Sequence, residues 1–284
     1  MGAAYTDSHV HFWDRSLRPY PWLAEFPQIA GPHDPADLAL EAAPDPPSRV
    51  VFVQADCDRG SAPGEASWVE SLAGKGPRVA GIVAFAPMDA GPETQKALQS
   101  LASRPLVRGI RHLIQGEADP GFCMRPAFVA GVRQCGEMGL TFDLCLRHFQ
   151  LAPAVELVRT CPGTSFVLDH AGKPDLASGL LDPWRTHIEA LAALPNCVCK
   201  VSGLVTEAGS AALDIDRFVP TISHLLATFG PKRLLFGSDW PVVKLAAPYT
   251  AWLSLARQLL SPLSPADQEA IFTHNAGRVY RLGQ

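Results

Sequence analysis

The 284-residue sequence lacks several features that define large classes of protein. It has no excess of basic residues, because 24 Lys and Arg stand against 28 Asp and Glu, and the two signs are interspersed. Without a basic stripe to neutralise phosphates, we expect no nucleic-acid partner. No apolar run reaches the roughly 18 residues that a membrane helix needs, and no basic, apolar leader precedes Tyr5. We therefore expect no membrane partner.

Paired cysteine motifs are also missing. The seven cysteines are odd in number and scattered, without any C-x-x-C pair, which argues against a disulfide framework and against a zinc ribbon. We expect reduced thiols and a cytoplasmic location. Cys197 and Cys199 share one face of an expected strand, but no two further ligands stand nearby, so we expect both in the core.

What the sequence contains is an alternation of β-rich runs and helical stretches. Eight apolar, β-rich runs lie at residues 4–12, 49–56, 78–87, 106–115, 141–149, 164–172, 198–205 and 233–242. Segments between them, such as 126–138 and 153–161, have helical spacing of apolar residues and a proline near the start. Eight strand-then-helix repeats predict an α/β fold, a single (β/α)8 TIM barrel over residues 1–284. The Pro-rich segment 19–47 is expected to be a loop insertion over the barrel mouth.

Polar residues concentrate late in the expected strands, where barrel enzymes place their catalytic groups. The first strand ends with His9 and His11, and the eighth ends with Asp239. The polar residues of the other strands include Arg111, His112, Arg147, His148, Asp169, His170, Lys200 and Ser202. Because residues two apart in a strand project to the same side, His9 and His11 can chelate one ion. An acid opposite two histidines suits activation of a water molecule, which makes Asp239 a candidate general base.

Several of these residues also have a structural interpretation. Asp239 before a proline suits a helix N-cap or turn, and His170 suits a core position with its hydrogen bonds satisfied. Arg111 and Arg147 are candidates to hold substrate oxygens or to form ion pairs in the barrel. Lys200 is expected to bond substrate oxygens or to neutralise Asp169.

Three tryptophans, Trp13, Trp22 and Trp240, lie near the expected mouth. Their flat faces suit stacking on a sugar ring, and the alternative is apolar packing on the barrel. We assign these tryptophans, together with His112, to the expected substrate-binding set.

The strand ends resemble those of the amidohydrolase superfamily. The resemblance is carried by DSHVHFW (7–13), RGIRHLIQ (108–115), VLDHAGKP (167–174), CKVSGLVTEA (199–208) and FGSDWPV (236–242), and it spans nearly the whole chain. Within the superfamily, the chain resembles the amidohydrolase-related (amidohydrolase 2) family, which includes L-fucono- and L-rhamnono-lactonases and 2-pyrone-4,6-dicarboxylate lactonase. The resemblance implies a barrel of the metal-dependent-hydrolase type with a hydrolytic site at the strand ends.

The resemblance also implies roles for individual residues. His9 and His11 become first-strand ligands or electrophilic groups, His170 the sixth-strand histidine, and Asp239 the acid that takes a proton from water. Binuclear relatives carry a carboxylated lysine or a glutamate at the fourth strand, where this chain has RGIRH (108–112), which argues against a binuclear centre. Two alternatives remain open. One is a single divalent ion, zinc being favoured, held by His9, His11, Asp239 and His148; the other is no ion at all.

The expected function is hydrolysis of a sugar-acid lactone, a carboxylic-ester hydrolase reaction. Asp239 activates water, and His170 with the first-strand histidines or their metal stabilises the oxyanion. The expected partner is a small sugar lactone. A metal-dependent decarboxylase on the same barrel and a catalytically silent sugar-binding barrel are the alternatives. The stereochemistry of the lactone and the oligomeric state are not readable from the sequence, so a homo-oligomer is left open.

Overall fold

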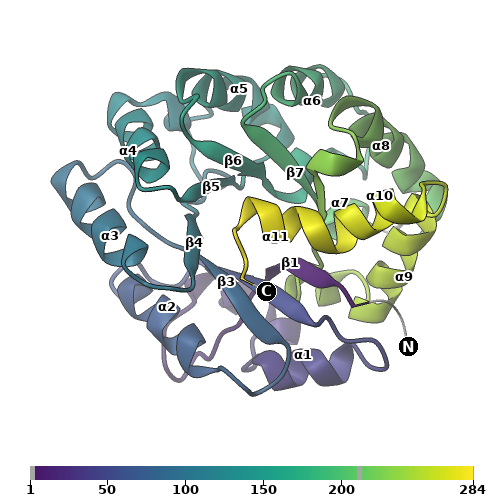
Figure 1. Ribbon diagram of the computed structural model, residues 1–284, viewed down its shortest axis with the longest axis horizontal. Helices are drawn as coiled ribbons and strands as arrows, with labels where there is room; N and C mark the ends of the chain where they lie inside the picture. The colour runs from purple at the N-terminus through teal and green to yellow at the C-terminus, as the bar shows by residue number, and fades with distance from the viewer. Residues whose placement is uncertain (1–3, 210–212, 284) are drawn as a thin grey trace.

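The eight expected strands form one closed parallel barrel. The computed structural model describes residues 4–209 and 213–283, so the remaining positions of the predicted 1–284 domain lie outside the described residues. The strands are β1 (Thr6–Val10), β2 (Arg49–Val53), β3 (Arg78–Ala84), β4 (Val107–Ile110), β5 (Thr141–Leu144), β6 (Ser165–Leu168), β7 (Cys197–Val201) and β8 (Leu234–Phe236). Strands adjacent in sequence pair in parallel, and the ring closes where Val10 pairs with Trp240. The predicted (β/α)8 barrel is therefore confirmed (Figure 1).

Helices surround this ring and follow the strands in turn. They are α1 (Pro35–Glu41), α2 (Ala62–Ser71), α3 (Pro92–Ala102), α4 (Pro126–Glu137), α5 (Leu151–Thr160), α6 (Trp184–Ala192), α7 (Leu204–Glu207), α8 (Ile215–Thr228), α9 (Tyr249–Leu260), α10 (Pro265–Glu269) and α11 (Asn275–Val279). The two helices predicted at 126–138 and 153–161 correspond to α4 and α5. None of the helices in the described part of the chain combines the length and apolarity needed to cross a membrane.

The observed strands are shorter than predicted because the last residues of each predicted run leave the sheet at the barrel mouth. The run 164–172 stops pairing after Leu168, and His170 then adopts a left-handed conformation with φ 53°. The run 233–242 stops after Phe236, and Asp239 has φ 62°. The sequence pattern does not show where these strands end, because the residues that follow them are buried as well.

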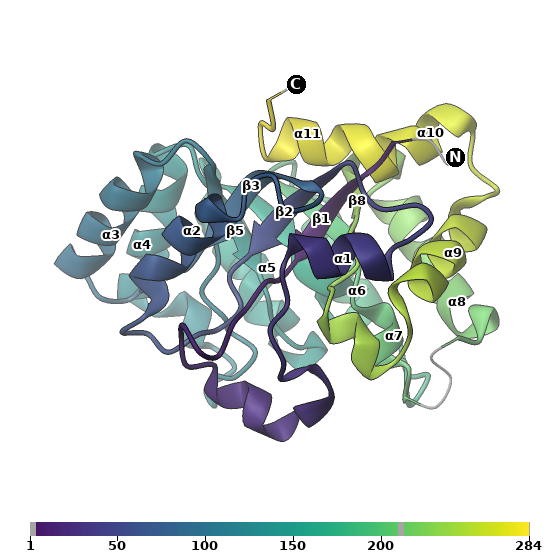
Figure 2. The ribbon, with the colours of Figure 1, turned by 90° about the horizontal axis from the view of Figure 1, so that it is seen from below.

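The Pro-rich segment 19–47 contains more regular structure than the predicted loop insertion. It forms 3-10 helices at Pro21–Glu25 and Pro27–Ile29, and then α1. Asp34 caps α1 by accepting the backbone N–H groups of Ala36 and Asp37, and Pro35 occupies the first turn, where its missing N–H is not needed. The expectation of loops alone is therefore wrong for 35–41, which is the first helix of the outer ring. Figure 2 shows the 3-10 helices at the opposite end of the barrel from α11.

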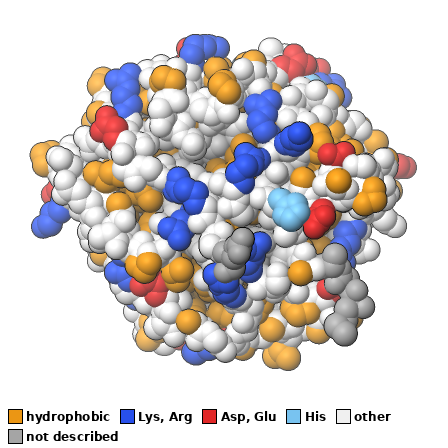
Figure 3. All heavy atoms as spheres, viewed as in Figure 1, with side chains coloured by type: hydrophobic (Ala, Val, Ile, Leu, Met, Phe, Trp, Pro, Cys, Tyr) orange, Lys and Arg blue, Asp and Glu red, His pale blue; other side chains and the backbone are white. Residues whose placement is uncertain are grey.

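The C-terminal segment covers the end of the barrel at which the strands begin. Tyr280 and Leu282 pack with an apolar layer inside the barrel that contains Val51, Val53, Val83, Val167, Val198 and Leu235. The amide of Asn275 donates to the carbonyls of Pro231 and Leu234, both at 2.8 Å. Lys and Arg side chains gather on this face (Figure 3), and Arg278 fastens the segment by donating to the Lys232 carbonyl.

One buried carboxylate ties the loops after β1 and β2 together. Glu65 on α2 is 2% exposed, and its Oε1 accepts hydrogen bonds from the Tyr20 hydroxyl and the Ala55 N–H, both at 3.2 Å. The Ala55 carbonyl in turn accepts from the indole N–H of Trp22 at 2.8 Å. Burial raises the pKa of Glu65 to about 7, although these two hydrogen bonds act in the opposite direction.

This raised pKa predicts a pH-dependent stability. Because the folded protein holds the Glu65 proton more tightly than the unfolded chain between pH 4.5 and about 7, the free energy of unfolding falls as pH rises through that window. Glu65→Gln should remove this fall, an effect on the order of 3 kcal/mol, in denaturant titrations at pH 4.5 and 7.5. Glu70→Gln, which neutralises a part-exposed carboxylate on the same helix, is the matched control. An unaltered pH dependence in Glu65→Gln would contradict the prediction.

Candidate active site

A cavity of about 340 Å³ opens at the C-terminal ends of the strands. His11, His170 and Asp239 lie in its wall, so the structure brings together residues from the first, sixth and eighth strand ends. Its sides also include Trp22, Phe26, Asp56, Arg111, Arg147 and Lys173. Trp22 and Phe26 come from the segment 19–47, which therefore lies at the mouth as expected from the sequence.

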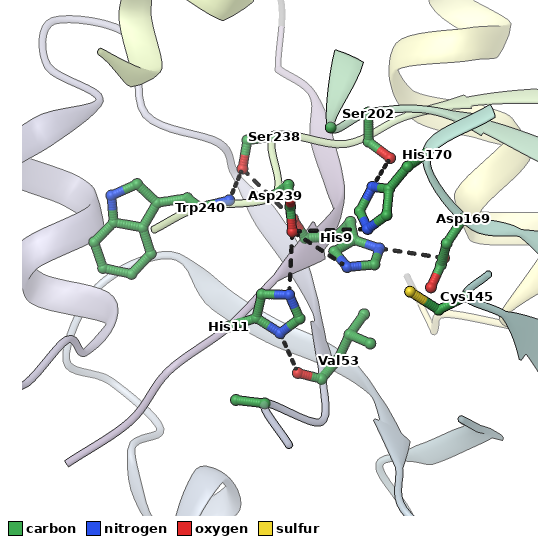
Figure 4. A network of polar contacts seen from close by, with 12 residues as sticks. His9, His11, Val53, Cys145, Asp169, His170, Ser202, Ser238, Asp239 and Trp240 are labelled. Carbon is green, nitrogen blue, oxygen red and sulfur yellow. Dashed lines mark hydrogen bonds and ion pairs between the residues drawn. The ribbon is translucent and has the colours of Figure 1, made fainter. Parts of the chain in front are cut away.

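Three histidines converge on one carboxylate oxygen, Oδ1 of Asp239 (Figure 4). Nε2 of His11 lies 3.2 Å from this oxygen, Nε2 of His9 lies 3.6 Å away, and Nε2 of His170 lies 3.9 Å away. All four side chains are more than nine-tenths buried. The two histidines of the first strand thus project to the same side, and both face the acid that follows the eighth.

The second nitrogen of each ring fixes its orientation. Nδ1 of His11 lies 2.7 Å from the Val53 carbonyl, which only accepts, so this nitrogen carries a proton and Nε2 is the ring nitrogen that faces Asp239. Nδ1 of His170 lies 3.0 Å from the Ser202 hydroxyl. Contacts of this kind hold imidazoles in place for a ligand on the other nitrogen. Gly203 leaves room for His170, since a Cβ at this position would lie 2.5 Å from Nδ1.

Burial sets the charge of these groups. It lowers the pKa of His170 to about 4, and burial together with the charge of Lys200 lowers the pKa of His9 well below its ordinary value. Both imidazoles are therefore neutral at pH 7. Burial raises the pKa of Asp239, but His170, His11 and His9 lower it by more, so the carboxyl is ionised. Neutral imidazole and ionised carboxylate are the forms that bind metal ions.

A network of buried charges lies next to the histidines. Nζ of Lys200 lies 2.7 Å from Oδ2 of Asp143 and 3.0 Å from Oδ1 of Asp169, and Arg111 lies 3.1 Å from Oδ2 of Asp169. Asp169 also faces Nδ1 of His9 at 3.3 Å. In formal charges, the two cations and the three carboxylates, Asp239 included, leave one negative charge in excess. A cation is thus favoured electrostatically at the mouth.

Two predicted roles are wrong: Lys200 as a substrate contact and His148 as a metal ligand. Lys200 is fully buried and bonded to two carboxylates, so the predicted substrate contact is wrong, and its alternative, neutralisation of Asp169, is what the structure contains. His148 is wrong as a metal ligand, because β5 ends at Leu144 and His148 falls in a short 3-10 helix beyond it. Its Nδ1 lies 3.3 Å from the Lys173 carbonyl, not among the converging histidines.

The structure also moves three predicted substrate contacts into the core. Nδ1 of His112 accepts the Met88 N–H at 3.1 Å, and the ring packs among phenylalanines. Trp13 and Trp240 are fully buried, with their indole N–H groups donating to the Ile29 carbonyl and to Glu41 respectively. For these two tryptophans the alternative of apolar packing is correct. The remaining predicted tryptophan, Trp22, does line the cavity.

Among the residues of the cavity wall that were not predicted are Asp56, Cys145 and Lys173. Asp56 ends the predicted run 49–56, so the same strand-end argument would have found it. Cys145 directly follows β5, but a thiol in an apolar run carries no sequence signal of its own. Lys173 depends on the left-handed backbone after β6, which no spacing announces.

Known proteins resemble this chain over nearly its whole length. Residues 6–282 match the family model described as amidohydrolase. An L-fucono-1,5-lactonase from Burkholderia multivorans is 35% identical over 99% of this chain and 97% of its own length, and one from Burkholderia ambifaria is 32% identical over 97% and 95%.

A crystal structure of an amidohydrolase from Burkholderia multivorans with bound zinc is also similar. Its TM-score is 0.88 at 34% identity, and the match covers 99% of this chain and 100% of that chain. Because the family model spans nearly the whole chain and full-length relatives exceed 30% identity, this chain belongs to the amidohydrolase family, as its strand-end motifs predicted.

Proposed function

We propose that this chain is a hydrolase that opens a sugar-acid lactone by attack of water on the ester carbonyl. The observation that carries the proposal is the convergence of His9, His11 and His170 on Oδ1 of Asp239 at a cavity on the strand ends. Two full-length relatives named as L-fucono-1,5-lactonases support a sugar lactone as the substrate.

The charges around the cavity support a neutral substrate. Arg111 pairs with Asp169, and Lys173 lies 2.6 Å from Oε1 of Gln115 and 3.8 Å from Glu207. Among the described cations of the cavity wall, only Arg147 at the rim forms no ion pair. A decarboxylase must hold a substrate carboxylate, for which unpaired cations are the usual partners. This charge distribution favours a polyhydroxylated lactone over that alternative.

The donor set fits a single divalent ion. Imidazole nitrogens and a carboxylate are ligands that zinc prefers, and Nε2 of His11 lies 3.2 Å from a carboxylate oxygen of Asp239 while its Nδ1 is bonded to the Val53 carbonyl. We propose that His9, His11, His170 and Asp239 hold one zinc ion. The similar amidohydrolase with bound zinc supports this choice of metal. When bound, the ion supplies Lewis-acid polarisation of the lactone carbonyl.

The chain's own residues complete the reaction. All three histidines face Oδ1 of Asp239, so Oδ2 is the oxygen left to take a proton from the attacking water. Arg111 lies in the cavity wall already paired with Asp169, so it acts through its positive charge, and not through a free hydrogen bond, on the negative charge that develops at the carbonyl oxygen. As the ring C–O bond breaks, Asp239 returns the proton to the leaving oxygen, which becomes the hydroxyl of the open aldonic acid.

Lactone hydrolysis by the purified protein tests this proposal. We expect turnover of one stereochemical group within a panel of six-carbon and 6-deoxy aldonolactones, followed as proton release with a pH indicator. Asp239→Asn should lower kcat by about 10²–10⁴ without changing the circular dichroism spectrum, because an amide does not accept the proton. Near-normal turnover in the folded variant would exclude Asp239 as the base.

The two alternatives give different results in the same assay. Carbon dioxide release from a planar carboxylate, with all lactones left intact, would identify a decarboxylase. A silent sugar-binding barrel would bind lactones with the same affinity in wild type and Asp239→Asn, with no turnover in either.

Metal content provides an independent test. We expect about one zinc ion per chain by elemental analysis, lost in His9→Asn and in His11→Asn because each variant removes an imidazole ligand. His148→Asn, which changes a histidine outside the converging set, is the matched control and should retain the metal. Chelation should abolish lactone turnover, and zinc should restore it. Full activity in the metal-free protein would show instead that the protein's own side chains supply the electrophile.

A further inference from the structure

Backbone strain is concentrated at the cavity. Among the described residues, six non-glycine positions have positive φ, and four of them line the cavity: Asp56, His170, Lys173 and Asp239. Such conformations are unfavourable for most side chains, and they cluster at functional sites where the surrounding structure enforces them. His170 and Asp239 belong to the proposed catalytic cluster. Asp56, with φ 56°, has no role in the mechanism above.

The backbone around Asp56 is held from several elements. Oε1 of Gln54 accepts the Asp56 N–H at 2.7 Å, and the Gln54 carbonyl accepts a hydrogen bond from Arg111 beyond β4. Ala55, which lies between Gln54 and Asp56, donates its N–H to Glu65 on α2. These bonds fix the loop that follows β2 and offset the strain of a left-handed residue. The position of Asp56 is therefore set before any substrate binds.

The backbone around Asp56 is hydrogen-bonded, but the Asp56 carboxylate is not. It lines the cavity, it is exposed there, and it forms no hydrogen bond or ion pair with any described residue. The surrounding cavity wall partly desolvates the carboxylate and raises its pKa, and the nearby charges of Arg111, Arg59 and His11 act against the rise. Asp56 lines the same cavity as His11 and Asp239, so its carboxylate faces a lactone that is bound there.

The wall beside Asp56 is apolar. Trp22 donates its indole N–H to the Ala55 carbonyl next to Asp56, and Trp22 and Phe26 both line the cavity, with ring centroids 5.9 Å apart. A sugar lactone presents apolar C–H faces and hydroxyl edges, which match an aromatic wall next to a hydrogen-bond acceptor.

We propose that Asp56 is a specificity-determining residue that accepts a hydrogen bond from a lactone hydroxyl close to the ester carbonyl. The inference rests on the proposed lactonase function and narrows its substrate class to lactones with a free hydroxyl at that position. A fixed, charged acceptor that is otherwise unpaired discriminates strongly against a substrate lacking the hydroxyl. The expected preference is roughly tenfold to a hundredfold in kcat/KM.

Paired variants and paired substrates test the proposal. Asp56→Gly keeps the left-handed backbone and removes the side chain, whereas Asp56→Asn keeps the shape and removes the charge. Each is assayed on an aldonolactone and on its 2-deoxy and 3-deoxy counterparts. Asp58→Asn is the matched control, because Asp58 lies two residues away, caps the Gly60 N–H and is not part of the cavity wall.

We expect Asp56→Gly to lower kcat/KM for the hydroxylated lactone by roughly tenfold to a hundredfold and to leave one of the deoxy lactones within about threefold of wild type. Removing the hydroxyl and the carboxylate together should then be no worse than removing either alone. Asp56→Asn should fall between Asp56→Gly and wild type, and Asp58→Asn should keep the wild-type preference. Equal losses on all three lactones in Asp56→Gly, with wild-type turnover intact, would overturn the role of Asp56 and leave the lactonase function standing.

A binding assay separates this result from failure of the proposed function. If wild type hydrolyses none of the lactones, the lactonase proposal fails, and the corresponding hydroxylated and deoxy lactams are titrated by calorimetry instead. A wild-type preference for a hydroxylated lactam that disappears in Asp56→Gly would support hydroxyl recognition. Equal affinities of wild type for all the lactams would overturn it.

Discussion

The pairing of Lys200 with Asp143 and Asp169 inside the barrel is the interaction on which the candidate site depends. Burying charged groups is unfavourable unless each is paired, and here every member has a partner within 3.1 Å. Asp169 shares its two oxygens between Lys200 and Arg111 and also faces His9. The orientation of a first-strand histidine is thus set by side chains from the sixth and seventh strands.

The same network reaches both ends of the barrel. Arg111 extends it to the Gln54 carbonyl at the mouth, and the Tyr280 hydroxyl joins it from the opposite end by donating to Asp143 at 2.6 Å. Below the mouth, the barrel is filled by an apolar layer and by the C-terminal segment. Stability is concentrated there, which allows the loops at the mouth to hold Asp239 and other residues in strained conformations.

The sequence was sufficient for the order of the strands and for the residues that converge, but not for which way each side chain faces. The strand-end argument found His11 and Asp239 because the eight runs are distinct and end in polar residues. It wrongly assigned Lys200 and His112 to the substrate. Successive side chains of a strand point to alternate faces, but this rule tells which residues face the cavity only when the true end of the strand is known. Glu65 carries no signal at all, since a single acid in a helix looks like a surface residue until the loops that cover it are placed.

The bond between Tyr280 and Asp143 has a consequence for how the protein is made. Tyr280 directly follows the last helix, α11, and barrel closure pairs Val10 with Trp240. As the chain is synthesised from its N-terminus, the first contact waits for Tyr280 and the second for Trp240 to leave the ribosome. The bond of Asp143 to Tyr280 and the contact of His9 with Asp239 are therefore made late, after the strands that hold Asp143 and His9 have already been synthesised.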